Sequence, residues 1–358
     1  MCHKIIFMPP KVSVLMSVYN GEEYLRVAIE SILNQTFSDF EYIIINDCST
    51  DGSREIILSY NDPRIRLIDN VSNQGLTKSL NIGIDAALGE YIARMDADDI
   101  SLPDRFKKQI EFLHKNPETA MVGSSAIYVD ETGKELHTVN VYIPPDLILA
   151  RLFFGNVFVH TSVMGKSNLF KKFKYDVSLL HAQDYYLWSQ IAFENKVANI
   201  EEPLVKYRVH NQSISVSKFE KQESFVKKTF AFHLSLLNIK SISDEKLEMH
   251  YLLLRNQYNT GNTSTQQKLV LLRWLCLLKN KNQHLDIYNQ KFFKEQLEIY
   301  WKLFFDVNSS FYYGIKAIPF IFDSFNENIR LKTKLIFALR CIKAEIKNEF
   351  NKTRSLQN

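Results

Sequence analysis

The sequence predicts an α/β protein with a mostly parallel sheet and helices on both faces, followed by an α-helical region. Strand and helix patterns alternate through the first hundred residues, as they do in βαβ units. Beyond Ser215 glycine becomes scarce and helical spacing dominates. We therefore expect two domains, an α/β domain at residues 1–215 and an α-helical region at residues 216–358.

Composition limits the possible partners and compartments. A net charge of +4 in 358 residues is too small to indicate nucleic acid. Residues 315–358, however, carry nine Lys or Arg against four Asp or Glu, an excess of five. This basic tail predicts peripheral contact with an anionic surface such as the inner membrane, and a solvated helix face is the alternative. Scattered cysteines, no recognisable signal peptide and no apolar run of about 18 residues favour a cytoplasmic location.

The predicted elements of the α/β domain follow from hydrophobic periodicity. Short apolar runs predict buried strands, and apolar residues three and four apart predict amphipathic helices. The predicted strands are Val12–Val18, Phe40–Asn46, Ile65–Ile68, Tyr91–Met95, Met121–Val129 and Lys196–Ile200. The predicted helices are Glu22–Gln35, Ser53–Tyr60, Leu76–Leu88, Pro103–Asn116 and His181–Glu194, with a less regular stretch at Val141–Leu180.

The α-helical region is predicted by the same periodicity. Its expected helices are Lys218–Leu237, Asp244–Tyr258, Ser264–Leu278, Phe292–Phe305 and Asn328–Phe350. The region shows neither a catalytic cluster nor a repeat.

The first strand-to-helix turn excludes two common nucleotide-binding motifs. Tyr19-Asn-Gly-Glu-Glu-Tyr24 has one glycine, so it is neither the GxGxxG of dinucleotide-binding proteins nor a P-loop. A diphosphate therefore needs another source of positive charge, such as a metal ion.

Three carboxylates follow the strand Tyr91–Met95. Asp96, Asp98 and Asp99 stand at its carboxyl end, where open α/β sheets bind ligands. Asp96 and Asp98 are two residues apart and could face one Mg²⁺ or Mn²⁺, which carboxylates hold together with substrate phosphates. The alternative is a solvated strand end, with Asp99 capping the next helix.

Further polar residues stand at the ends of other predicted elements. Asp47 could accept hydrogen bonds from a base or ribose, or cap its turn, and the turn composition alone explains Asp51. Asp184 lies near a helix N-terminus among aromatic residues of the kind that stack on sugars, and a simple cap is the alternative. His210 shares a strand face with Arg208, and a structural role for it remains open.

Six segments in this order resemble family 2 glycosyltransferases of the GT-A fold. They are residues 12–25, residues 43–53, Asn73-Gln-Gly-Leu76, Arg94-Met-Asp-Ala-Asp-Asp99, Gln183-Asp-Tyr-Tyr-Leu-Trp188 and Tyr207-Arg-Val-His210. The resemblance spans residues 12–215 and gives residues 1–215 the expected role of a catalytic domain. It does not extend to the α-helical region.

The resemblance implies roles for individual residues in binding a nucleoside-diphosphate sugar, with a UDP-sugar as the first expectation. Tyr19 and Asp47 would contact the base, with Glu22 and Asp51 nearby, and Asp96 would approach the ribose. A second group would bind Mn²⁺ or Mg²⁺ and perform the chemistry. In it Asp98 would bind the metal, His210 could assist, and Asp184 would be the catalytic base, since Gln183 stands where relatives often have Glu.

The expected reaction is an inverting transfer to a saccharide or lipid-linked acceptor in bacterial cell-surface polysaccharide, O-antigen or capsule synthesis. A hydroxyl is a weak nucleophile, so a carboxylate must accept its proton during attack. One alternative is a non-catalytic nucleotide- or carbohydrate-binding protein with the same fold. Another is a sugar-phosphate nucleotidyltransferase, which would need a glycine-rich loop that Tyr19-Asn-Gly21 does not supply.

Overall fold

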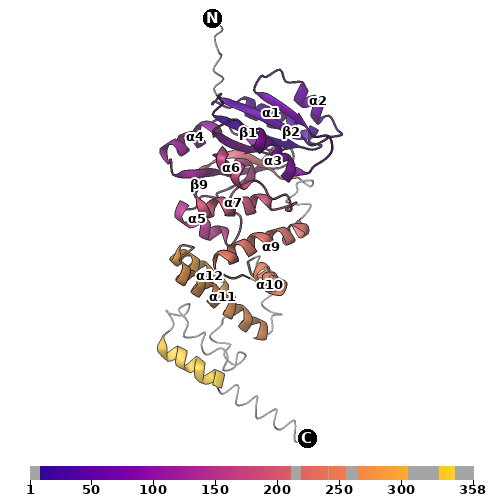
Figure 1. Cartoon of the computed structure of the whole chain (residues 1–358). Coiled ribbons are helices and arrows are strands. Elements are labelled where there is room, and N and C mark those ends of the chain that lie inside the picture. The colour runs from indigo at the N-terminus through magenta and orange to yellow at the C-terminus, as the bar shows by residue number, and fades with distance from the viewer. Residues whose placement is uncertain (1–8, 211–218, 241, 255–264, 305–329, 343–358) are drawn as a thin grey trace, which may run out of the picture. The chain divides into compact units, whose positions relative to one another are not determined.

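The computed structural model describes residues 9–210, 219–240, 242–254, 265–304 and 330–342 (Figure 1). The chain divides into two compact units, Met1–Thr229 and Phe230–Asn358. The predicted domain boundary at residue 215 lies outside the described residues, as do parts of the predicted helices Asp244–Tyr258 and Asn328–Phe350.

The described part of the first unit is built on a nine-stranded mixed sheet. Its strand order is β3-β2-β1-β4-β8-β6-β9-β5, and β7 pairs with β6. The strands that were predicted run parallel in two groups, β3-β2-β1-β4 and β6-β9. They are β1 (Val12–Val18), β2 (Phe40–Asn46), β3 (Ile65–Asp69), β4 (Tyr91–Met95), β6 (Thr119–Val129) and β9 (Lys196–Arg208).

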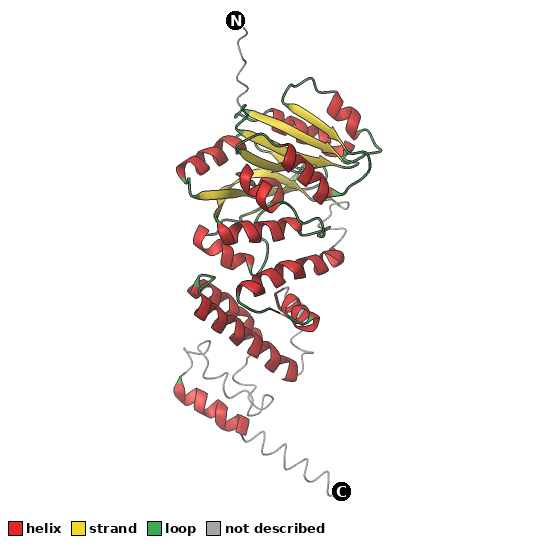
Figure 2. Ribbon diagram, in the orientation of Figure 1, coloured by secondary structure: helices red, strands yellow, loops and turns green. Residues whose placement is uncertain are grey.

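Helices cover both faces of the parallel part of the sheet (Figure 2). Alternate residues of β1 point to opposite sides: Val14 and Met16 belong to the core that includes Leu25 of α1 (Glu22–Leu33). On the other side, α3 (Leu76–Ala86) lies so close to the sheet that a Cβ at Gly83 would be 2.0 Å from Leu15 Cδ1. Two further predicted helices are α2 (Ser53–Leu58) and α4 (Arg105–Lys115).

The stretch predicted to be irregular contains several short elements. They are α5 (Pro145–Leu152), η1 (His160–Ser162), β8 (Met164–Lys166) and α6 (Ser167–Phe173), followed by α7 (Gln183–Glu194). The strands β5 (Ile100–Ser101) and β7 (Glu135–Val139) were also not predicted. Strands of two or three residues, such as β5 and β8, show no hydrophobic period, and the five residues of β7 are mostly exposed, so the sequence pattern does not reveal these strands.

One predicted boundary was wrong in an informative way. The strand expected to end at Ile200 continues to Arg208 as one 13-residue strand, β9. Its register with β6 is irregular near Pro203, which cannot donate a ladder hydrogen bond. The continuation carries Arg208 to the carboxyl ends of β4 and β6.

The described part of the second unit is helical. Its elements are the end of α9 (Phe219–Leu236), α10 (Asp244–Leu254), α11 (Thr265–Leu285), α12 (Gln290–Phe304) and a helix at 331–342. Buried aromatic and aliphatic side chains form its core, among them Trp274, Leu278, Tyr288, Phe293 and Trp301. No helix in the described ranges is long and apolar enough to cross a membrane.

Candidate active site

The carboxyl ends of three parallel strands bring most of the predicted site residues to one edge of the sheet. Val18 at the end of β1 is level with Asn46 of β2, and Met16 of β1 is level with Met95 at the end of β4. Tyr19, Asp47 and Asp96 follow these strands directly. Tyr19 is 52% exposed, so its ring is accessible to a ligand.

The turns after β1 and β2 are held together by reciprocal hydrogen bonds. The backbone N–H of Glu22 donates to Asp51 Oδ2 at 3.0 Å, and the N–H of Gly52 donates to Glu22 Oε2 at 2.6 Å. Burial would raise the pKa of Asp51, but hydrogen bonds from Ser53 and from the N–H of Glu22 hold it below its ordinary value. In the structure, Glu22 and Asp51 thus join two turns to each other.

Asp47 is buried and both of its carboxylate oxygens accept hydrogen bonds from the loop between β3 and α3. Asn70 Nδ2 and the N–H of Gln74 donate to Oδ1 at 2.7 and 2.8 Å. The N–H of Gly75 donates to Oδ2 at 2.8 Å. Asp47 therefore shapes this loop, and direct contact between Asp47 and a base stays a prediction.

Asp98 lies beside His210, as the proposal of a shared metal site requires. The distance between Asp98 Oδ2 and His210 Nε2 is 3.1 Å, and the Asp98 side chain is 35% exposed. Partial burial and the charge of Asp96 raise the pKa of Asp98, against the opposing effect of His210. The described residues hold no cluster of three or more potential metal ligands. The pair fits a cation that takes its other ligands from substrate phosphates and water.

Asp99 is buried and does not cap the next helix, which was the alternative role considered for it. The N-cap of α4 is Asp104, whereas Asp99 Oδ1 accepts the backbone N–H of Arg208 at 2.7 Å. Burial and the charges of Asp98 and Asp96 raise the pKa of Asp99 well above its usual range. Asp99 therefore joins the loop after β4 to the end of β9.

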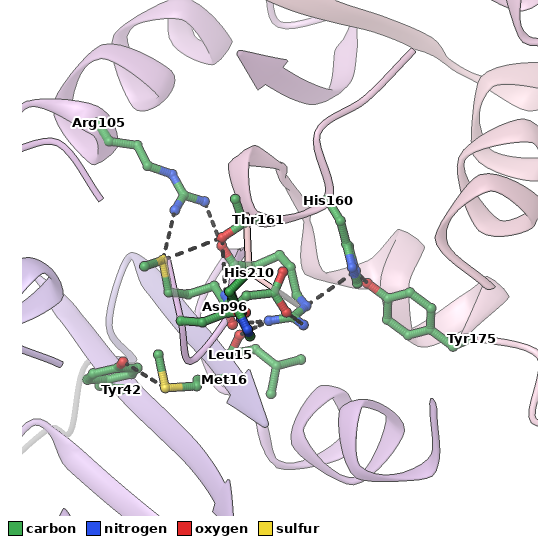
Figure 3. A network of polar contacts seen from close by, with 12 residues as sticks. Leu15, Met16, Tyr42, Asp96, Arg105, His160, Thr161, Tyr175 and His210 are labelled. Atoms are coloured by element: carbon green, nitrogen blue, oxygen red, sulfur yellow. Dashed lines mark hydrogen bonds and ion pairs between the residues drawn. The ribbon is translucent and has the colours of Figure 1, made fainter. Parts of the chain in front are cut away.

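A buried arginine, Arg94, connects Asp96 to the wall of the site, where Figure 3 labels Asp96, His160, Thr161 and Tyr175. Its Nη2 forms an ion pair with Asp96 Oδ1, and its Nε donates to His160 Nε2 at 3.2 Å. Tyr175 Oη lies 2.8 Å from the same His160 nitrogen. The backbone N–H of Asp96 also donates to Thr161 Oγ1 at 3.1 Å. These contacts fix Asp96 from both its side chain and its backbone.

Asp184 lies in the first turn of α7, where Asn156 Nδ2 donates to its Oδ2 at 2.9 Å. Asp184 and Asp96 both raise the pKa of His160 through their charges, against stronger lowering by burial and Arg94. Both carboxylates are thus close to one histidine, although they are separated by 88 positions in the sequence. The carboxylate of Asp184 is partly exposed.

Three of the four rings near Asp184 that were predicted to stack on a sugar are buried, and the fourth, Tyr186, is half-buried. Tyr185 and Trp188 are 3% and 0% exposed, and His181 is also buried. Trp188 instead packs edge-on against Phe158, His160, Phe170 and Tyr175. An amphipathic helix places such residues on its buried face, which explains the aromatic cluster without a ligand.

Sequence reasoning gave no role to four residues that organise the site: Arg94, Asn156, His160 and Tyr175. One signal was available, because an arginine inside a buried apolar strand needs hydrogen-bond acceptors nearby. Which residues supply them depends on long-range packing, and the spacing of the sequence does not contain that information.

The family model described as "Glycosyl transferase family 2" matches residues 13–172. An uncharacterized glycosyltransferase of Methanocaldococcus jannaschii is 39% identical, over 63% of this chain and 79% of that protein. Two relatives are from Escherichia coli. The O-antigen biosynthesis glycosyltransferase WbnJ is 34% identical over 58% of this chain and 82% of its own length. The UDP-Glc:alpha-D-GlcNAc-diphosphoundecaprenol beta-1,3-glucosyltransferase WfgD is 29% identical over 67% and 96%.

Solved structures share the fold at low sequence identity. S. aureus TarS (residues 1–349) in complex with UDP-GlcNAc has a TM-score of 0.55 and 15% identity, covering 92% of this chain and 90% of that chain. The mannosyltransferase PcManGT from Pyrobaculum calidifontis, in complex with GDP-Man and Mn²⁺, has a TM-score of 0.50 and 14% identity, with coverages of 96% and 88%. These similarities show the GT-A type of α/β fold.

Proposed function

This chain belongs to glycosyltransferase family 2, and we propose that it transfers a sugar from a UDP-sugar to a hydroxyl of a saccharide or lipid-linked acceptor. The proposed pathway is the synthesis of a cell-surface polysaccharide such as O-antigen or capsule. Relatives with these activities support the choice of donor and acceptor class. The observation that carries the proposal is that Asp96 lies near both Asp98, which pairs with His210, and His160, which also lies near Asp184.

The donor side of the proposed site is the edge formed by the turns after β1, β2 and β4. The exposed ring of Tyr19 is suited to contact the base. The hydrogen bonds that join Glu22 to Asp51 and Gly52 shape the turns after β1 and β2. Asp47 would act on the base either directly or through the loop that ends at Gly75. Asp96 would hold the ribose, since Arg94 and Thr161 fix its position.

Asp98 and His210 would hold Mn²⁺ or Mg²⁺ together with the diphosphate of the donor. When bound, such a cation neutralises charge that develops on the leaving nucleoside diphosphate. Arg208 supports this pair, because its Nε donates to the carbonyl of Asp98 at 2.8 Å and its guanidinium stacks on Tyr24. Tyr24 in turn contacts the ring of His210, with 5.2 Å between centroids.

Asp184 would accept the proton of the acceptor hydroxyl as that oxygen attacks the anomeric carbon. Its partly exposed carboxylate keeps one oxygen on Asn156, and this contact would orient the other toward the acceptor. In-line attack from the side opposite the leaving group inverts the configuration, so an α-linked donor would give a β-glycoside.

We further propose that the enzyme acts at the cytoplasmic face of the membrane through the helix at 331–342. Leu331, Leu335 and Leu339 on this helix are 50% to 65% exposed, while Phe337 and Cys341 are buried. Residues 330–342 carry four Lys or Arg and no Asp or Glu. An exposed apolar stripe flanked by basic residues is suited to the surface of an anionic bilayer.

Two experiments test these proposals. Purified full-length chain with Mn²⁺ and a panel of nucleotide sugars should show slow donor hydrolysis and a thermal shift with its own donor. If no nucleotide sugar in the panel gave hydrolysis or a thermal shift, the proposed glycosyltransferase activity would be contradicted. For the membrane, Leu335→Gln with Leu339→Gln should abolish flotation with phosphatidylglycerol vesicles, whereas Thr333→Gln should not. Equal flotation of the wild type, the double variant and Thr333→Gln would exclude the helix at 331–342 as the membrane contact.

A further inference from the structure

His160 stands between the two halves of the proposed site and takes part in no step described above. It begins η1 and lies close to Arg94, Tyr175 and Trp188. We infer that His160 is a positioning residue for donor binding: its Nε2 fixes the guanidinium of Arg94, which in turn fixes the carboxylate of Asp96. This inference rests on the proposed role of Asp96 in binding the donor.

Arg94 is buried and needs hydrogen-bond acceptors around its guanidinium. Its side chain is 1% exposed, and a buried guanidinium is stable only when acceptors surround it. Asp96 accepts from Nη2, and the carbonyls of Met95 and Leu15 lie at Nη1. His160 is the acceptor at Nε, and it comes from a different part of the chain. Loss of His160 would leave Nε unsatisfied and remove the contact that fixes this edge of the guanidinium.

The protonation state of His160 allows this contact. Arginine donates hydrogen bonds and accepts none, so Nε2 must be the unprotonated nitrogen, and the neutral ring carries its proton on Nδ1. Burial and the positive charge of Arg94 lower the pKa of His160 to about 4, which is consistent with a neutral ring at physiological pH. Tyr175 Oη can then donate to the same lone pair at 2.8 Å.

Neighbouring rings fix the position of the His160 ring. His160 packs edge-on against Trp188 of α7 and Tyr175, with centroid distances of 5.9 and 5.7 Å. Because α7 also carries Asp184, the same histidine joins the proposed base side to the donor side. Because His160 Nε2 faces the guanidinium of Arg94, the effect of His160 on the donor passes through Arg94.

The test is a double-mutant cycle that uses UDP with Mn²⁺ as the probe and calorimetry as the readout. His160→Leu removes the acceptor and should weaken UDP binding about tenfold. His160→Gln can place an amide oxygen at the position that His160 Nε2 occupies in the wild type, so it should retain most of the wild-type UDP affinity. In the Asp96→Asn background His160→Leu should have less than a twofold effect. His114→Leu, the same substitution at an exposed position in α4, is the matched control and should leave UDP affinity within twofold.

Three results would overturn the inference. One is unchanged UDP affinity in His160→Leu, and another is an equal loss in the Leu and Gln variants. The third is an undiminished effect of His160→Leu in the Asp96→Asn background. If His160→Leu fails to fold, His160→Asn replaces it, since the shorter amide cannot reach Arg94. Failure of the wild-type chain to bind UDP would contradict the proposed function itself, and it is separable because it precedes any variant.

Discussion

Arg208 Nε donates to the main-chain carbonyl of Asp98 at 2.8 Å, and the backbone N–H of Arg208 donates to the Asp99 carboxylate at 2.7 Å. The end of β9 thereby fixes the loop after β4, although 110 positions separate Arg208 from Asp98. Arg208 Nη1 also donates to the carbonyls of Asp130 and Glu131. One residue thus joins the end of β9 to two other segments around the proposed metal site, the loop after β4 and the turn after β6.

Arg208→Lys tests whether this arrangement positions Asp98. Lysine keeps the charge but cannot reproduce the planar fork, so we expect UDP–Mn²⁺ affinity to fall about tenfold, equivalent to about 1.4 kcal/mol. Arg54→Lys, at a half-exposed ion pair with Asp69, is the control and should bind normally. Calorimetry measures both. Normal UDP–Mn²⁺ binding by a folded Arg208→Lys variant would exclude the positioning role.

Asp98→Asn tests the proposed metal site. The amide is a much poorer ligand for a hard cation than a carboxylate, so Mn²⁺ should no longer strengthen UDP binding. His210→Gln should weaken the same coupling to a smaller extent, since the diphosphate and Asp98 remain. The measurement is UDP affinity with and without Mn²⁺. A full Mn²⁺ effect in Asp98→Asn would show that the metal binds elsewhere.

Asp47→Asn separates the structural role of this residue from a role in base recognition. Both oxygens accept N–H groups, so an amide must place its own NH₂ against a donor, and unfolding free energy should fall by about 1–3 kcal/mol. Asp39→Asn, at an exposed position, is the control. Urea unfolding followed by circular dichroism gives the difference. Unchanged stability would contradict the structural role derived from these contacts.

The parallel part of the fold could be predicted because its strands are continuous apolar runs. Val12–Val18 and Tyr91–Met95 have the predicted bounds, and the carboxylates after Met95 lie at the sheet edge as expected. These features follow from local pattern and strand order. His210 lies beside Asp98, and its role in binding a metal, which only the resemblance implied, stays a prediction.

The remaining features depend on contacts that local pattern does not encode. A helix cap was the alternative considered for Asp99 because aspartate is a common cap, but its carboxylate accepts a backbone N–H from a distant strand. Trp188 was expected to stack on a sugar, but aromatic residues also form buried cores, and Trp188 is buried. The acceptor at Arg94 Nε, His160, comes from a segment with no strong periodicity.

The second unit should lose stability in mild acid. Burial lowers the pKa of His233 and of His250 to about 3, and the charge of His250 lowers the pKa of His233 further. The unfolded chain binds these protons near pH 6.5, so stability is fully present above that pH and falls as the pH drops toward 3. From pH 7 to pH 5 the expected loss is about 2 kcal/mol for each histidine.

His250→Asn tests this pH dependence with little change in packing. The Asn oxygen can replace His250 Nδ1 as acceptor for Trp274 Nε1, now 3.1 Å away, while the titrating group is lost. Urea unfolding at pH 7 and pH 5 should then show a smaller stability difference than in the wild type. An identical difference would mean that His250 is not a source of the acid sensitivity.

The most direct test of the proposed reaction is the transfer rate of Asp184→Asn with its own donor and acceptor, beside its affinity for UDP–Mn²⁺. Without a base for the acceptor hydroxyl, kcat should fall by about 10²–10⁴-fold while UDP affinity stays within twofold. Asp146→Asn, at an exposed position in α5, should retain full activity. A kcat within threefold of the wild type would contradict the assignment of Asp184 as the base, and with it the central step of the proposed mechanism.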